Sequence, residues 1–390
     1  MKKKLLVILC VVAMLAACLI ISAAAADSTR VAYCEHCEQE VTWEKIVFGA
    51  QELPEGETSV HKHYYLDKDY VSTTVNDQFS TRSGVTVCLD FNGHSWHSFG
   101  RAFNVAVTTG STEGSILNLM DTVGGGEVVG LSSMDAKGDG SGSKTNNVGG
   151  GTIWVDANSK INVYGGTYKL NVTTPDNLRT NNGGVVALNG ASEMNLYGGT
   201  IEGALVGQKG GAIHLYGAGQ LNIYGGRVTR GTSVNGTGNC ISTGTYGVIR
   251  LSGAAEIDEI WSTGNYQKLV VDSDFTGWAN LAYQSGKVTA AEGLQIGTGV
   301  TGSLENGWLM CDLDGGYRVV NNGTKLVLAA IPEGVLYRTC PVCGDDVKHA
   351  WQPFAPKTGS TLPSGTHHCY LDRTMTENET AAFAPSNLQV

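Results

Sequence analysis

The stretch "INVYGGTY", Ile161–Tyr168, returns as "MNLYGGTI" from Met194 and as "LNIYGGRV" from Leu221. Each copy has an asparagine in its second position, and a Gly-Gly pair ends 11 residues before that asparagine. The unit is therefore two short strands joined by a turn, as in "GGTIWVDANSKINVYGG". Repetition of such a unit is typical of a solenoid, in which each turn of the chain contacts mainly its neighbours.

The asparagine position can be followed in both directions along the chain. We place Asp90 and Asn118 in this position before Asn162, and Arg250 after Asn222, which gives intervals of 28, 44, 33, 27 and 28 residues. The interval of 44 accommodates a Gly/Ser/Asp-rich loop, "LSSMDAKGDGSGSKTNN". A period near 28 predicts an all-β fold, a right-handed parallel β-helix solenoid over residues 85–330.

Alternation along the strands assigns the side chains to two faces. Ile161 and Val163 are expected to fill the core, whereas Asn162 and Tyr164 point outward. The following Gly-Gly pair makes the corner, since glycine takes positive φ without steric cost. In the preceding strand, Ile153 and Val155 point inward and Trp154 points outward.

The outward aromatic side chains are the candidate binding residues. Tyr164, Tyr197 and Tyr224 form one row, with Trp154 and His214 on the neighbouring face. Flat rings at solenoid spacing would suit stacking on the sugar rings of an extracellular polysaccharide or a host surface glycan. The alternative is that the tyrosines pack on one another and stiffen the sheet.

The first 26 residues have the pattern of a secretory signal peptide, with three lysines, an apolar run and small residues before the cleavage site. Without them the formal charge is 23 minus 36, or −13. So acidic a surface argues against nucleic acid as a partner. We expect a secreted or cell-surface protein with no membrane insertion after cleavage. Lipidation at Cys18, within "LAAC", is the alternative to cleavage.

Two similar Cys/His modules flank the solenoid, at residues 31–80 and 335–390. Each has Cys-x-x-Cys, then a tryptophan, then a His-rich cluster that enters Tyr-Leu-Asp. Two thiolates on a tight turn with distant His or Cys ligands suit a structural zinc site. The candidate ligands are Cys34, Cys37, His61 and His63 in the first module, and Cys340, Cys343, Cys369 and His367 or His368 in the second.

The cysteines also allow other readings. An exported protein more often oxidises its cysteines, so disulfides or free thiols compete with zinc. The second module matches the first as far as the point where the first enters its solenoid. It is therefore either a C-terminal cap or the start of a further unit in a tandem protein.

Few residues of the coils suit catalysis. Asp90 stands in the asparagine row and is explained as a ladder residue, His94 follows a turn-like Asn-Gly, and Asp121 comes in the next coil. Lys169, Glu202 and Asp258 are expected to follow one another on the strand after the corner. A glycoside hydrolase needs two carboxylates about 5 to 10 Å apart. A groove of outward acids and bases beside the loop at 122–149 would favour an enzyme. Outer faces of only Asn, Tyr and small residues would favour a binding or structural role.

The coils resemble right-handed parallel β-helix proteins of the pectate-lyase-like superfamily, with "LDFNGHSW" similar to an opening coil. Together with "YCEHCEQEVTW" and "HYYLD" they resemble secreted repeat proteins of Gram-positive gut bacteria. The superfamily includes polysaccharide lyases, but no catalytic cluster of theirs matches this chain, and a fold alone does not confer activity. We expect a non-catalytic surface protein; the alternative is a polysaccharide lyase or glycoside hydrolase.

Overall fold

The computed structural model describes most of the chain between residues 29 and 371. The described ranges are 29–46, 60–72, 78–108, 110–132, 148–172, 180–234, 238–244, 246–263, 268–284, 288–289, 291–300, 303–304, 308–311, 316–331, 336–339, 348–354 and 368–371. Within these ranges every regular element is a strand. No helix among the described residues is long and apolar enough to cross a membrane.

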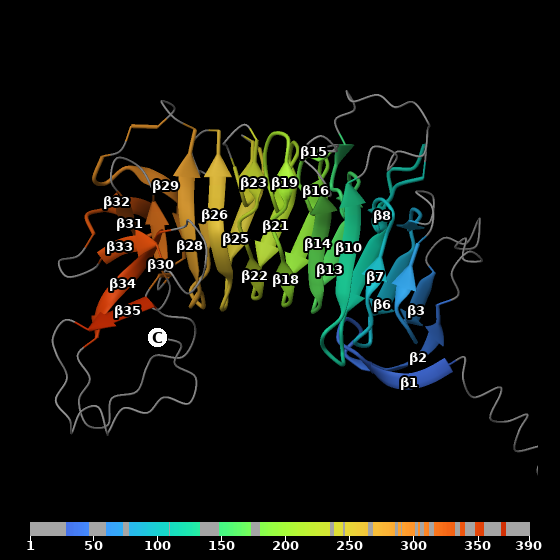
Figure 1. Ribbon diagram of the computed structural model, residues 1–390. Coiled ribbons are helices and arrows are strands. Elements are labelled where there is room, and N and C mark those ends of the chain that lie inside the picture. Colours follow the sequence, from blue (N-terminus) through green and yellow to red (C-terminus); the bar gives the residue numbers. More distant parts are fainter. Residues whose placement is uncertain are drawn as a thin grey trace, which may run out of the picture.

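The strands build an extended, mostly parallel sheet that is consistent with a β-solenoid (Figure 1). Each turn of the chain, here called a coil, adds a strand to each of three parallel ladders. The first ladder contains β3 (His61–Tyr65), β6 (Thr86–Asp90), β9 (Ile116–Met120), β13 (Lys160–Val163), β17 (Glu193–Leu196), β21 (Gln220–Ile223), β25 (Val248–Leu251), β27 (Leu269–Val271) and β29 (Gln295–Gly299).

The other two ladders run beside the first and merge near the C-terminal end. The second contains β4 (Tyr70–Val71), β7 (Trp96–His97), β10 (Glu127–Ser132), β14 (Thr167–Val172), β18 (Thr200–Ile201), β22 (Arg227–Val228), β26 (Glu256–Ser262), β28 (Trp278–Tyr283) and β30 (Trp308–Cys311). The third contains β5 (Phe79–Ser80), β8 (Phe103–Val105), β12 (Ile153–Val155), β16 (Val186–Leu188), β20 (Ile213–Leu215) and β24 (Ile241–Thr243). Both ladders then pair with β26. The register between β26 and β28 shifts between Ile257 and Ile260.

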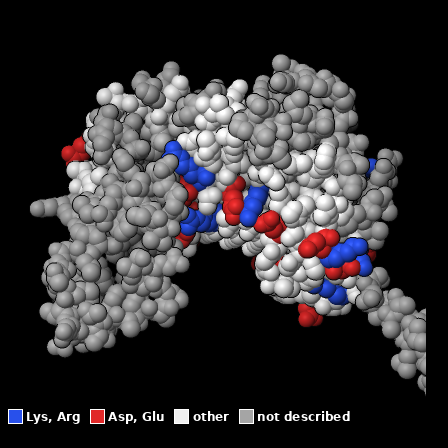
Figure 2. All heavy atoms as spheres, viewed as in Figure 1, with Lys and Arg blue, Asp and Glu red and all other residues white. Residues whose placement is uncertain are grey.

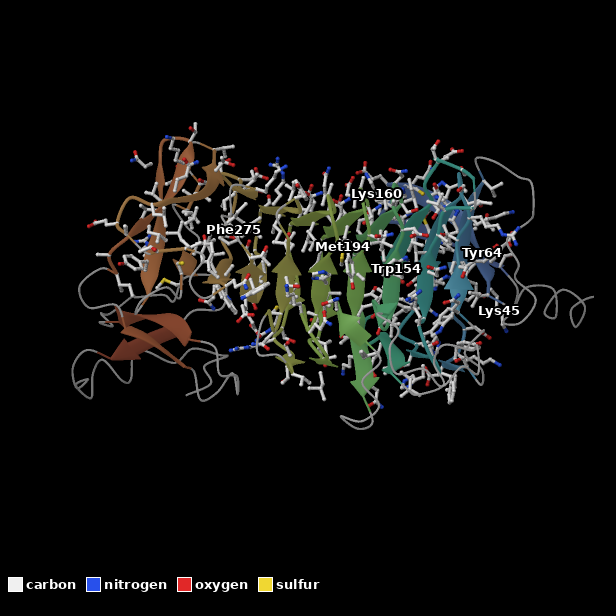
Figure 3. The ribbon with its side chains drawn as sticks, turned by 90° about the horizontal axis from the view of Figure 1, so that it is seen from above. Lys45, Tyr64, Trp154, Lys160, Met194 and Phe275 are labelled. Carbon is white, nitrogen blue, oxygen red and sulfur yellow. The ribbon has the colours of Figure 1, made fainter. Side chains whose placement is uncertain are left out.

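The repeat sets the register of the coils as expected. Asn162 pairs with Asn195, and Asn195 pairs with Asn222. The residues that flank these asparagines, such as Ile161 and Val163, are buried in one continuous core. Figure 3 shows Met194 and Phe275 inside the stack of coils, where both are almost fully buried, and Lys160 at its edge.

Glycines make the corner after this strand. Gly166, Gly199 and Gly226 follow one another in successive coils with φ of 84°, 82° and 79°. A Cβ atom on Gly199 would lie 2.5 Å from the carbonyl oxygen of Gly166 in the preceding coil. The second glycine of each pair is therefore required both for its left-handed backbone and for the close approach of the coils.

One position in the first coil was predicted wrongly. The register pairs Cys88, and not Asp90, with Asn118, while Asp90 pairs with Met120. The first interval of the repeat is thus 30 residues, and Cys88 is the first member of the asparagine row. The error was a shift of two residues, which keeps a side chain on the same face of a strand and so leaves the hydrophobic pattern unchanged.

The two ends of the solenoid differ. At the N-terminal end, the hairpin of β1 (Thr29–Cys34) and β2 (Gln39–Lys45) continues through β2 into a parallel pairing with β3. At the other end, β31 (Tyr317–Asn322) and β32 (Lys325–Ala329) pair antiparallel with β30, β29 and each other. Two-stranded sheets form at the corners, from β11 (Val148–Gly149) with β15 (Thr180–Asn182) and from β19 (Leu205–Val206) with β23 (Thr232–Ser233).

The second module repeats the strand order of the first. β33 (Leu336–Thr339) pairs antiparallel with β34 (Lys348–Phe354), which pairs parallel with β35 (His368–Leu371). The hairpin β1–β2 and strand β3 are connected in the same way. The two modules, which are similar in sequence, thus also share the same strand pairing.

Candidate metal centre

The hairpin β1–β2 packs against the first coils of the solenoid (Figure 1). Its contact is a small cluster, separate from the main core, in which Cys34, Trp43, Tyr65, Cys88 and Met120 are buried. The Trp43 indole donates a hydrogen bond of 3.1 Å to the Ala32 carbonyl. So small a cluster buries little apolar surface, which leaves the hairpin dependent on other contacts.

The turn between β1 and β2 brings two thiols together. β1 ends at Cys34, and the Glu38 amide donates a hydrogen bond of 2.8 Å to the Cys34 carbonyl. Glu38 has a φ of 54°, a left-handed conformation that lets the four-residue turn close. Cys37 lies in this turn, on the same side as Cys34.

Strands β3 and β6 supply the remaining donors. Their register places His63 beside Cys88 and His61 two residues earlier on the same face. Ligand atoms of Cys34, Cys37, His63 and Cys88 all lie within 4.8 Å of one another. His61 adjoins the group, with its Nε2 atom 3.3 Å from the Cys88 Sγ and 3.6 Å from the Cys37 Sγ.

The spacing fits a tetrahedral metal ion. Zinc at about 2.3 Å from sulfur and about 2.0 Å from nitrogen needs edges of about 3.8 Å between sulfurs and about 3.5 Å between sulfur and nitrogen. The Cys34 and Cys88 sulfurs are 3.7 Å apart, and the His63 Nε2 lies 3.2 Å from the Cys37 Sγ. This buried group could therefore hold a metal ion such as zinc.

The electrostatics of the group favour a thiolate. A hydrogen bond with Cys88 lowers the pKa of the Cys34 thiol to about 3, against the opposing effect of burial. The same interaction, with burial, raises the pKa of Cys88, so one proton stays between the two sulfurs. Burial also lowers the pKa of His61, which favours the neutral imidazole. Metal ligands must be deprotonated thiolates and neutral imidazoles. Cys34 and His61 thus favour the ligating form, whereas burial raises the pKa of the Cys37 thiol to about 11.

A salt bridge makes a second attachment between the hairpin and the first coil. The Arg30 guanidinium pairs with the Asp90 carboxylate and lies over the Tyr65 ring, 4.6 Å from its centroid. Asp90 is fully buried and also accepts hydrogen bonds from the amides of Asn92 and Thr122. Asp90 thus joins the hairpin to the turns that follow β6 and β9.

Three of the four metal ligands predicted in the first module, Cys34, Cys37 and His63, are members of this group. The fourth, His61, adjoins it. Cys88 was missed because it lies outside the module, 51 residues beyond Cys37. The repeat could have revealed it, because the correct register of the coils places Cys88 at the position where later coils have asparagine. All five cysteines with described side chains are free.

The ligands predicted in the second module cannot be compared in the same way. Cys340, Cys343 and His367 lie outside the described residues, and only the backbone of His368 and Cys369 is described. The prediction of a second site stays a prediction.

The structure divides the predicted binding residues into two groups. Tyr164, Tyr197 and Tyr224 form a stack, with ring centroids 4.8 and 4.9 Å apart and interplanar angles of 13° and 8°. Their flat faces cover one another, and the Tyr164 hydroxyl lies 3.2 Å from the His36 Nδ1 atom of the hairpin. The row thus offers mainly ring edges and hydroxyl groups to a ligand.

Trp154 and His214 lie on the third ladder, apart from the tyrosine stack. Trp154 packs beneath the Arg101 guanidinium, 5.3 Å from the ring centroid. His214 contacts the Tyr216 ring edge to face and the Ser242 hydroxyl, and its burial lowers its pKa to about 4. Both side chains are only partly exposed.

The second ladder carries a polar groove. A hollow of about 360 Å³ is lined by His97, Glu127, Val129, Lys169, Leu170, Asn171, Glu202 and Gly203. The Lys169 Nζ lies 2.7 Å from a Glu127 oxygen and 3.4 Å from a Glu202 oxygen. Figure 2 shows acidic and basic side chains meeting in the middle of this face, over β10, β14 and β18.

Comparison of the chain with protein-family models, with curated proteins and with solved structures finds no match in any of the three.

Proposed function

We propose that this chain is an exported, non-catalytic surface protein, a right-handed parallel β-helix rod whose N-terminal hairpin is held by a structural zinc ion. The zinc ligands in this proposal are Cys34, Cys37, Cys88 and a histidine, His63 or His61. The rod would present its outer faces to extracellular polysaccharide or host surface glycan. Right-handed coiling is the hand that connections between parallel strands of one sheet almost always take.

One observation carries the zinc assignment: the hairpin and the solenoid each contribute donors to a single group with tetrahedral spacing. Four protein donors complete the coordination of zinc and leave no position for a substrate, as in structural sites. A zinc ion there would join the hairpin, through Cys34 and Cys37, to β3 and β6. It would stabilise a cluster that is too small to hold the hairpin alone.

Metal analysis tests this assignment. The mature protein, purified without chelators, is expected to contain zinc, and prolonged treatment with a chelator under reducing conditions is expected to lower its melting temperature. Zinc added back should restore the melting temperature. Full oxidation of the cysteines with no bound metal would overturn the proposal and favour a Cys34–Cys88 or Cys34–Cys37 disulfide.

The groove on the second ladder favours a second candidate, a glycoside hydrolase or polysaccharide lyase. Glu127 and Glu202 both contact Lys169, so their nearest oxygens lie within about 6 Å, a separation that glycosidases use. A groove of outward acids and bases was the feature expected of an enzyme. Against catalysis, the Lys169 ammonium pairs with both carboxylates, so the two acids are engaged with one cation rather than open to a substrate.

A polysaccharide panel separates the two candidates. The non-catalytic proposal expects binding without release of reducing ends or of unsaturated products. Turnover by the intact chain that is lost in Glu127→Gln and Glu202→Gln, and kept in Glu193→Gln on the first ladder, would establish the enzyme. Binding to none of the glycans, with no turnover, would leave only the structural part of the proposal standing.

A further inference from the structure

The asparagine row is a chain of hydrogen bonds with one direction. The Nδ2 atom of Asn222 donates to the Oδ1 of Asn195, that of Asn195 donates to Asn162, and that of Asn162 donates to Asn118. The three distances lie between 2.7 and 2.8 Å. Asn118, Asn162 and Asn195 therefore each accept from the following coil, and the whole row donates toward the N-terminal end.

The row ends at the candidate metal centre. The Nδ2 atom of Asn118 lies 3.4 Å from the Cys88 Sγ and 3.3 Å from the Val87 carbonyl oxygen. Cys88 is the residue that takes the asparagine position on β6, as the register shows. The terminal donor of the row is thus directed at a sulfur of the candidate site.

The orientation of the Asn118 amide is determined by its neighbours. Its Oδ1 atom already accepts the hydrogen bond from Asn162, and the side chain is fully buried. Turning the amide over would place two NH₂ groups against each other and leave a buried donor without an acceptor, which costs about 1 to 3 kcal/mol. The row therefore holds an N–H group toward Cys88.

We propose that Asn118 is a positioning residue for the metal centre, and that its N–H to sulfur hydrogen bond raises the metal affinity of Cys88. Such a bond directs a donor at the ligating atom and fixes the sulfur in its ligating orientation. Groups that hydrogen-bond to metal ligands typically change metal affinity by about 10-fold to 100-fold. Donors that themselves accept hydrogen bonds are polarised and strengthened, so Asn162 and Asn195 would reinforce the effect.

This inference rests on the proposed metal centre, and cobalt substitution tests it separately. The full chain is loaded with Co²⁺, whose thiolate charge-transfer band reports on Cys–metal bonds, and zinc affinity is measured by competition with a chromophoric chelator. Asn118→Asp keeps the shape and the acceptor for Asn162 but presents oxygen to Cys88. Asn118→Leu removes the donor altogether. Asn222→Leu, at the far and partly exposed end of the row, is the matched control.

We expect both Asn118 variants to bind zinc about 10-fold to 100-fold more weakly than the parent. Their charge-transfer band should move to longer wavelength, because a hydrogen bond lowers the energy of the sulfur lone pairs. Asn222→Leu should keep the parent affinity and band. A merely structural role for Asn118 would lower stability without moving the band.

The outcomes distinguish the two proposals. If the parent protein binds neither Co²⁺ nor zinc at Cys88, the metal centre itself is refuted. If the parent binds and Asn118→Asp binds equally well with an unchanged band, the role of Asn118 alone is refuted. If Asn118→Leu does not fold, Asn118→Asp carries the comparison by itself.

Discussion

The same position on the first ladder holds a thiol on β6 and an amide in the next four coils. Asn118, Asn162, Asn195 and Asn222 each find a partner in the adjacent coil, so their polar groups are satisfied by repetition. Cys88 precedes all of them and contacts the hairpin instead. The central coils are stabilised by identical neighbours, whereas the end coil needs a cap and a contact of a different kind.

Loss of Cys88 should show this difference most strongly. Cys88→Ser removes the only donor that the solenoid strand β6 gives to the group, so we expect the loss of one zinc equivalent and of several kcal/mol of hairpin stability. Metal analysis and amide hydrogen exchange of residues 29–46 measure the two effects. Cys240→Ser, a buried thiol of the central coils, is the control and should retain the zinc. An unchanged zinc content in Cys88→Ser would remove Cys88 from the site.

The salt bridge of the hairpin should have the next largest effect. Arg30→Met leaves the fully buried Asp90 carboxylate without its cation, and because the Arg30 side chain itself is 27% exposed we expect a cost below that of a fully buried pair, about 3 to 5 kcal/mol. Chemical denaturation at neutral pH measures the loss. Lys45→Met, which breaks the more exposed ion pair with Asp67, should cost less than about 1 kcal/mol. Equal costs for the two variants would contradict a special role for Arg30.

A core substitution in the central coils should affect stability and spare the metal. Met194→Ala leaves a cavity among the stacked aliphatic side chains, and we expect a cost of about 2 to 5 kcal/mol. The melting temperature should fall while zinc affinity stays at the parent value. A parallel loss of zinc would show that the core of the central coils and the metal centre depend on each other.

Acid should weaken the central coils through His214. Its pKa in the folded chain is about 4, below the ordinary value of 6.5, because burial disfavours the imidazolium. Between these values the unfolded chain binds more protons, so this contribution to stability is complete above pH 6.5 and is lost as the pH falls toward 4. His214→Gln should flatten the pH dependence of unfolding, measured on chelator-treated protein so that metal release does not contribute. An unchanged slope would argue against this assignment.

Much of the candidate site could be predicted from the sequence, and the part that was missed has a definite cause. Cys34 and Cys37 are close in sequence, and the two histidines are placed by the repeated spacing of the modules. Cys88 belongs to another element, and the alignment that would have found it was shifted by two residues toward Asp90. A two-residue shift preserves the alternation of faces, so hydrophobic pattern alone cannot detect it.

The sequence by itself determined the path of the chain within each coil, because its glycines, alternating aliphatic residues and asparagines recur at one spacing. Local conformation and the burial of alternate side chains are enough to establish that path. Only the tertiary structure decided that the hairpin, β3 and β6 meet around a group of thiols and imidazoles, and that the asparagine row ends on Cys88. Those contacts join residues far apart in the chain, and their distances depend on how whole coils and the hairpin pack in three dimensions.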